Sequence, residues 1–166
     1  AALLPRLLAR DAQPVACLVQ PKFLHKAQQH LVALGAADRV TLCPGDLTEP
    51  GLGLGAPLWR NEVREVYHLG AVYDLGIERA RGMRVNVVGT QQVLEFARNC
   101  PRLQRLHYVS TCFVSGRYDG VFSEDDLDVG QTFNNHYEET KFLAEVEVQA
   151  AMAAGLPVTI YRPSIV

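Results

Sequence analysis

The sequence has no apolar run near the roughly 20 residues that a transmembrane helix needs, and no basic start followed by an apolar stretch like that of a secretion signal. It also lacks a block of basic residues, and its net charge is only -2. A surface that binds nucleic acid needs a positive field, which this distribution of charge does not supply. We therefore expect a cytoplasmic protein with no membrane span and no nucleic-acid partner.

Cysteine and histidine are too scattered to build a metal site. Cys17, Cys43, Cys100 and Cys112 have neither the paired spacing of a zinc site nor the density of a disulfide scaffold. No two of the five histidines stand at the helical spacing that favours metal ligation. We expect four reduced cysteines and no metal.

What the sequence does contain is an alternation of short apolar runs with helical patterns. Runs such as residues 15–19 are continuously apolar, as burial on both faces of a parallel sheet requires. The pattern predicts a doubly wound α/β fold with a parallel sheet. Strands are expected over residues 14–19, 39–43, 65–69, 105–110 and 157–161, and helices over 1–10, 22–34, around 84–99 and around 137–153.

The ends of the chain bear on its domain organisation. The chain begins without methionine, partway into a leucine-rich helix, and stops directly after its last expected strand. We expect residues 1–166 to be one truncated domain of a longer protein that also supplies a C-terminal substrate region. Residues 116–135 contain no clear element, and so long a segment in a compact domain is typical of a functional loop.

A tyrosine and a lysine stand four residues apart on the last expected helix. Tyr137 and Lys141 would therefore share a face of that helix. A free phenol titrates near about pH 10, and a nearby ammonium lowers that value by stabilising the phenolate, which makes tyrosine a usable general acid or base. The same spacing also fits a pair with no catalytic role, in which the tyrosine packs on the helix and the lysine is exposed beside Glu138 and Glu145.

Hydroxyl groups follow the strand over residues 105–110. Ser110 and Thr111 come at the carboxyl end of this strand, where open α/β sheets bind ligands, and Thr111 precedes Tyr137 by 26 residues. A hydroxyl there could donate to a developing oxyanion, while Tyr137 supplies a proton and a nicotinamide supplies a hydride. The alternative is that both hydroxyls only satisfy backbone groups in a turn.

Five short motifs together make a family recognisable. The sequence resembles the extended short-chain dehydrogenase/reductase superfamily, and most of all its thioester reductase and fatty acyl-CoA reductase branch, the male-sterility-type domains. The resemblance covers nearly the whole chain and implies an NAD(P)-binding Rossmann fold. It is carried by residues 68–71, 85–90, 108–111, Tyr137 with Lys141, and 161–163, and for the branch by residues 68–75 and 133–147.

The resemblance implies a role for each motif residue. Thr111 would polarise the substrate carbonyl, with Ser110 the less suitable neighbour. Tyr137 would donate the proton, and Lys141 would both lower the pKa of Tyr137 and bond the nicotinamide ribose. Asn86 would be part structural and part proton relay.

The resemblance also implies which residues contact the cofactor. Asp46 and Leu47 would meet the adenine ring, although Asp46 after Gly45 equally fits a turn. The other positions implied are the strand ends and the last residues of the chain, namely Leu69, Gly70, Ala71, Val109, Lys141, Pro163, Ser164 and Ile165.

Two departures from the family pattern matter. The Gly-rich loop that carries the pyrophosphate is absent together with its central strand, so we expect the chain alone neither to fold stably nor to bind a dinucleotide. No acid follows the strand over 14–19 to repel the 2'-phosphate of NADP, and Gln20 and Lys22 stand there instead. We therefore expect NADP, with NAD as the alternative.

The leading hypothesis is an NADP-dependent reductase of an acyl thioester or an aldehyde, with the acyl group held on coenzyme A or a carrier protein. A nucleotide-sugar epimerase or dehydratase, or a 3-hydroxysteroid-like dehydrogenase, would use the same Tyr137 and Lys141. A dinucleotide sensor without catalysis would have no need to keep Thr111, Tyr137 and Lys141 together. The composition leaves the oligomeric state open.

Overall fold

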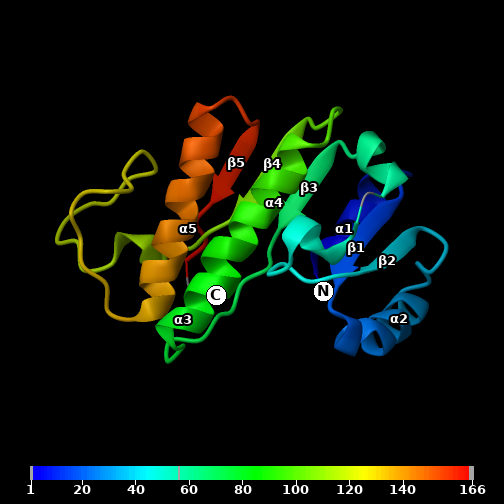
Figure 1. The fold of residues 1–166 in the computed structure, drawn as a ribbon, viewed down its shortest axis with the longest axis horizontal. Helices are drawn as coiled ribbons and strands as arrows, with labels where there is room; N and C mark the ends of the chain where they lie inside the picture. The colour runs from blue at the N-terminus through cyan, green and yellow to red at the C-terminus, as the bar shows by residue number, and fades with distance from the viewer. Residues whose placement is uncertain (1, 56, 165–166) are drawn as a thin grey trace. The chain divides into compact units, whose positions relative to one another are not determined.

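The structure is a computed structural model that describes residues 2–55 and 57–164. The chain divides into two compact units, which are described separately here (Figure 1). Unit 1 contains residues 1–46 and 53–55, and unit 2 contains residues 47–52 and 56–166. The expected position of Ile165 lies outside the described residues.

Unit 1 is a two-stranded parallel sheet with its helices. Its elements are α1 (Leu3–Arg10), β1 (Val15–Val19), the 3-10 turn η1 (Pro21–Phe23), α2 (Leu24–Ala33) and β2 (Val40–Pro44). Val15 lies opposite Val40 in the register. Leu31, Ala36 and Val40 form the buried core, against which the leucines of α1 pack because they line one face of that helix.

Unit 2 is a three-stranded parallel sheet in the order β3-β4-β5. Its strands are β3 (Glu65–His68), β4 (Arg105–Val109) and β5 (Val158–Tyr161), and its helices are α3 (Arg79–Gly82), α4 (Gly89–Arg98) and α5 (His136–Ala153). Helices α4 and α5 lie side by side over the sheet (Figure 1). The core between them is aliphatic and almost wholly buried, and includes Leu94, Ala97, Leu106, Ala144 and Val148.

The predicted α/β fold with parallel strands is confirmed. Each of the five expected strands is present, with ends that differ from the expected ones by one residue at most. The described strands pair in two sheets, and among them no strand pairs with both β1 and β3. The helix expected around residues 84–99 begins earlier, at Arg79, and includes a π-helical segment, Met83–Val88, that the apolar pattern did not indicate.

Among the described residues, 3-10 segments also occur outside the expected helices, namely η2 (Pro50–Gly53), η3 (Leu58–Glu62) and η5 (Cys112–Ser115). The four cysteines are free thiols, with Cys43 and Cys100 buried and Cys17 and Cys112 partly exposed. In the described part of the chain, no helix is both long and apolar enough to cross a membrane.

Residues 116–135 form a loop with a small core of its own against α5. Val114, Leu127 and Phe142 are buried together, and Phe133 packs on them. Gly116 opens the loop in the left-handed region, with φ of 53°, and an added Cβ there would lie 2.3 Å from the carbonyl oxygen of Thr132. The turn therefore needs glycine both for its backbone conformation and for close approach.

Replacing Gly116 with alanine should destabilise the full-length protein by about 1–3 kcal/mol, because the new methyl group adds backbone strain and a clash with a carbonyl oxygen. Gly130→Ala is the matched control, since Gly130 also has a positive φ but open space around its Cβ position. Urea unfolding of both variants measures the difference. Equal losses from the two substitutions would show that the contact with Thr132 is unimportant.

Candidate active site

The first turn of α5 is fixed by side-chain capping. Asn135 is the N-cap, and its side-chain oxygen accepts a hydrogen bond from the backbone N–H of Glu138 at 3.0 Å. The Glu138 carboxylate accepts in turn from the backbone N–H of Asn134 at 2.8 Å. These reciprocal bonds satisfy amides at the start of the helix and place Tyr137, the second helical residue, at a defined angle.

Tyr137 lies at the end of β4 as the sequence predicts, beside Thr111. Its side chain is only 5% exposed, and its ring meets those of Tyr73 and Phe113 edge to face, with centroids 5.0 Å and 6.4 Å away. Burial raises the pKa of the phenol, and a side-chain hydrogen bond with Thr111 partly opposes the rise. Tyr137 therefore remains protonated at neutral pH.

Thr111 begins the 3-10 turn η5 directly after β4. Its side-chain oxygen accepts from the backbone N–H of Phe113 at 3.2 Å, and the residue is buried. The Thr111 hydroxyl can accept from the backbone N–H of Phe113 and contact Tyr137 at the same time, because a hydroxyl has two acceptor lone pairs and one donor.

Lys141 is buried, with 3% of its surface exposed. Its Nζ donates to the carbonyl oxygen of Val109 at 3.0 Å and to the Tyr108 hydroxyl at 3.1 Å, and it lies 4.6 Å from the centre of the Tyr108 ring. Burial lowers the pKa of the ammonium to about 8, against an opposing contribution from Glu145. The reading of Lys141 as an exposed surface residue is therefore excluded.

One expectation about this pair needs correction. Lys141 was expected to lower the pKa of Tyr137, but in the structure the pKa of Tyr137 is raised by burial. The ammonium of Lys141 donates to Tyr108 and Val109 instead. Spacing on a helix brings two side chains to one face, but the direction of a pKa shift depends on burial, which the spacing does not reveal.

Two aromatic residues beneath Lys141 were missed by the sequence reasoning. Tyr108 is buried, and its pKa is raised by burial and then by the charge of Glu145. His68 ends β3, with its ring 5.5 Å from that of Tyr108 and its Nε2 3.0 Å from the Thr90 hydroxyl. Burial, followed by the charge of Lys141, lowers the pKa of His68 to about 3, so it is neutral. Their place at the ends of adjacent strands was the available signal.

The buried His68 should make the full-length protein sensitive to acid. Its folded-state pKa lies below the value of about 6.5 of an unfolded chain, so the unfolded state binds the extra proton as the pH falls. This one group should lower the free energy of unfolding by about 2 kcal/mol between pH 7 and pH 5. Urea unfolding at both pH values should show a smaller loss in His68→Gln, whereas His30→Gln on the exposed face of α2 should behave like the unaltered protein. Equal losses in His68→Gln and the unaltered protein would contradict this assignment.

Asn86 sits in the π-helical segment and is almost completely buried. Its Oδ1 accepts from the backbone N–H of Val72 at 2.9 Å, and its Nδ2 donates to the Thr140 hydroxyl at 3.1 Å. These bonds join the segment after β3 to α5. They support the expected structural role of Asn86. Its expected role in a proton relay stays a prediction.

In unit 2, the expected cofactor residues lie at strand ends. An added Cβ at Gly70 would lie 2.3 Å from Cδ1 of Leu47, so these two residues are in contact range only because one is glycine. Leu69 is 54% exposed although it is apolar, and Ala71, Pro163 and Ser164 are also exposed. Exposed apolar and backbone surface at the carboxyl ends of parallel strands suits a dinucleotide, and in this respect the residues fit the cofactor.

In unit 1, the expected cofactor residues follow β1 and β2. The amide Nε2 of Gln20 donates to Oδ2 of Asp46 at 2.7 Å. The ammonium of Lys22, an exposed residue, lies 5.0 Å from the centre of the Phe23 ring. No acid stands in the sequence directly after β1, as expected, but the pairing of β1 with β2 brings the carboxylate of Asp46 to Gln20. Among the described residues, no group of three histidines, cysteines or carboxylates could hold a metal ion.

Comparisons with known proteins agree with the recognition made from the sequence. Nonribosomal peptide synthetase asaC of Aspergillus flavus is 28% identical over 180 residues, which cover 94% of this chain and 17% of that protein. The alcohol-forming fatty acyl-CoA reductase of Simmondsia chinensis is 32% identical over 129 residues, which cover 72% of this chain and 26% of the reductase.

Among solved structures, the terminal R domain from the myxalamid PKS-NRPS biosynthetic pathway superposes with a TM-score of 0.84 at 30% identity. The match covers 98% of this chain and 45% of that one. The class is therefore a Rossmann-type domain of extended short-chain dehydrogenases/reductases, which are NAD(P)-dependent enzymes. The family model described as male sterility protein, an NAD-binding family, matches residues 1–166, and the chain belongs to that family.

Proposed function

We propose that the protein containing this chain reduces an acyl thioester or an aldehyde with NADPH, using Thr111, Tyr137 and Lys141. The observation that carries the proposal is the hydrogen bond of Thr111 with a buried Tyr137 whose pKa is raised. A reductase needs a proton donor at the carbonyl oxygen, and a phenol that stays protonated at neutral pH meets that need. The alternative reactions considered from the sequence find no separate support in this geometry.

Thr111 and Tyr137 act on the same oxygen in this proposal. Their side chains lie close together at the end of β4, so a carbonyl oxygen that takes the place of their mutual contact could accept from both hydroxyls. The phenol then gives up its proton as negative charge develops on that oxygen, and the cofactor supplies the hydride when it is bound. An aldehyde becomes an alcohol in this step. A thioester becomes a hemithioacetal, whose carbon–sulfur bond then breaks while the hydroxyl proton passes to the departing sulfur, so that a free thiol and an aldehyde are released.

Lys141 acts as a charged donor. An ammonium has three N–H groups, and the bonds to Val109 and Tyr108 use two of them. The third can hold a ribose hydroxyl of the cofactor. With a pKa of about 8, Lys141 is mostly protonated at pH 7, so this donor is charged when the cofactor binds.

In this proposal, strand-end residues contact the cofactor. Gln20, Lys22, Asp46 and Leu47 would contact its adenosine end, and residues 69–71 and 163–164 would contact the remainder. Two side chains favour different cofactors. The ammonium of Lys22 can attract the 2'-phosphate of NADPH, whereas the carboxylate of Asp46 beside Gln20 favours the free 2'-hydroxyl of NADH. We propose NADPH on the basis of Lys22. The ratio of the dissociation constants of NADPH and NADH in Lys22→Met tests this choice.

The relatives support the proposed substrate class. One is a nonribosomal peptide synthetase and another an alcohol-forming fatty acyl-CoA reductase, and we infer an acyl thioester carried on a carrier protein or coenzyme A. The chain spans 17% and 26% of these two proteins, so the parts that select the acyl group would lie in the rest of the protein.

The experiment measures NADPH oxidation by the full-length protein with an acyl-CoA, a carrier-bound acyl group, an aldehyde and a nucleotide sugar. We expect turnover with a thioester and release of an aldehyde or alcohol. Conversion of the nucleotide sugar without net NADPH consumption would instead favour an epimerase. Tight NADPH binding without turnover of any substrate would favour a sensor.

A further inference from the structure

A buried ion pair lies beyond the residues that the proposed chemistry uses. Arg162, directly after β5, donates from Nη2 and Nε to Oε1 of Glu145 on α5, at 2.6 Å and 2.9 Å. The Glu145 side chain is wholly buried, and that of Arg162 is 14% exposed. Two charges taken out of water in this way need further hydrogen bonds to offset their desolvation.

The second oxygen of Glu145 connects the pair to the candidate active site. It accepts a hydrogen bond from the hydroxyl of Ser110, the residue before Thr111. The backbone N–H of Ser110 donates to the carbonyl oxygen of Tyr161 at 2.7 Å. Ser110 is therefore held from both sides, by α5 and by β5, and the position of Thr111 follows from it.

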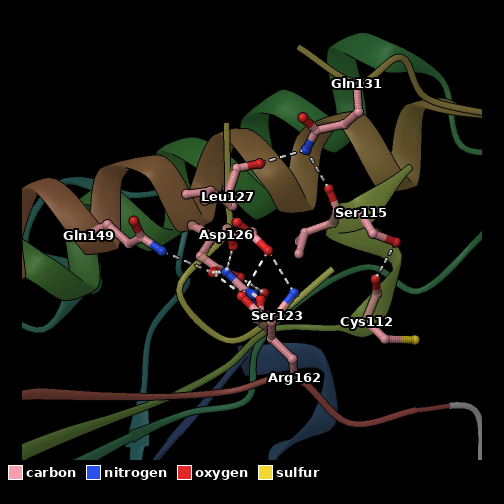
Figure 2. A network of polar contacts seen from close by, with 11 residues as sticks. Cys112, Ser115, Ser123, Asp126, Leu127, Gln131, Gln149 and Arg162 are labelled. Atoms are coloured by element: carbon pink, nitrogen blue, oxygen red, sulfur yellow. Dashed lines mark hydrogen bonds and ion pairs between the residues drawn. The ribbon is translucent and has the colours of Figure 1, made fainter. Parts of the chain in front are cut away.

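The guanidinium of Arg162 also connects the pair to the loop of residues 116–135. Nη1 donates to the carbonyl oxygen of Ser123 at 3.0 Å, and Nη2 donates to that of Asp126 at 2.7 Å. Figure 2 shows Arg162 beside both residues, with Gln131 bonded further along the loop. Arg162 thus joins β5, α5 and the loop, which ends at Asn135, the cap of the helix that carries Tyr137.

We propose that Arg162 and Glu145 form a positioning unit for the candidate active site, which sets Thr111 against Tyr137 through Ser110 and fixes the loop at the same time. Neither side chain reaches the reacting groups in this proposal, and the inference rests on the proposed reductase function. This role needs an arginine, because only a planar guanidinium with several N–H donors can bond the carboxylate of Glu145 and the two loop carbonyl oxygens at the same time.

The alternative is that the pair only stabilises the fold. A purely stabilising pair would change the fraction of folded protein, and the kcat of the folded enzyme would not move. A positioning unit predicts a lower kcat with unchanged NADPH affinity, because a small displacement of reacting groups lowers the rate without removing a cofactor contact.

The test uses Arg162→Lys and Glu145→Gln in the full-length protein. Arg162→Lys keeps the positive charge beside Glu145 but cannot keep all three sets of bonds, so it guards against simple loss of folding. The matched control is Glu147→Gln, the same change two residues along α5 at a partly exposed carboxylate that accepts from Gln91. The readouts are kcat, KM, the NADPH dissociation constant and hydrogen exchange of the amides of residues 117–131.

We expect kcat to fall about tenfold to hundredfold in both variants, with NADPH affinity unchanged in Arg162→Lys, which keeps the Glu145 charge that supports the Lys141 ammonium. Exchange over residues 117–131 should rise in Arg162→Lys. Glu147→Gln should leave all readouts as they are. Adding Ser110→Ala to Glu145→Gln should lower kcat little further, since both substitutions break the same bond.

Unchanged kcat in folded Arg162→Lys and Glu145→Gln, in an active protein, overturns the positioning unit and leaves the proposed function standing. Fully additive effects of Ser110→Ala and Glu145→Gln would overturn the connection to Thr111. An unaltered protein that reduces no thioester or aldehyde overturns the proposed function, and this inference with it.

Discussion

Tyr137→Phe is expected to lower kcat for NADPH-dependent reduction by about 10²–10⁴-fold, because it removes the proton donor and keeps the ring. The edge contacts with Tyr73 and Phe113 remain, so folding should be unaffected. The affinity for NADPH should also hold, since the cofactor contacts proposed here belong to other residues.

Steady-state kinetics of the full-length protein with an acyl thioester measure this effect. Tyr118→Phe is the matched control, because Tyr118 is an exposed phenol in the loop of residues 116–135, and it should behave as the unaltered protein does. A Tyr137→Phe variant that keeps most of its activity would remove Tyr137 from the chemistry.

Lys141→Met is expected to lower kcat/KM for NADPH by about 10²–10³-fold, since it removes a buried charged donor from the site. The pH profile should change as well. Burial lowers the pKa of Lys141 to about 8, so in the unaltered protein kcat/KM should fall about tenfold per pH unit above that value as the ammonium loses its proton.

The pH profile of Lys141→Met should lack this alkaline fall. Lys26→Met, a change at an exposed lysine of α2, should retain the profile of the unaltered protein. The charged and titratable groups that face Lys141 are Tyr108 and His68 from the neighbouring strands and Glu145 from α5. An alkaline fall that persists in Lys141→Met would assign it to another group.

Much of the fold could be predicted because the strands of a parallel sheet tend to be continuous apolar runs. Val15 to Val19 are all apolar and form β1, although in the structure they are only partly buried and Ala16 is exposed. The π-helical segment could not be predicted in the same way. The residue before it, Gly82, packs against the side chain of Thr140, where an added Cβ would lie 3.0 Å from Cγ2, and no local pattern indicates that long-range contact.

The candidate site likewise contains residues that could be predicted from the sequence and residues that could not. Tyr137, Lys141 and Thr111 could be found because helix spacing and a strand end place them. Glu145 and Arg162 could not, since their pairing depends on how β5 returns beside α5. The proximity of Asp46 to Gln20 could not be predicted for a related reason: Asp46 follows the neighbouring strand, 26 residues later.

The most direct test of the account is the fate of the hydride. The full-length protein would be given NADPH with deuterium at the transferable position of the nicotinamide, together with a carrier-bound acyl thioester, and the product examined by mass spectrometry. We predict deuterium on the former carbonyl carbon of a released aldehyde or alcohol, and formation of this labelled product that is about 10²–10⁴-fold slower with Tyr137→Phe. A product without deuterium, or no product from any thioester or aldehyde, would contradict it.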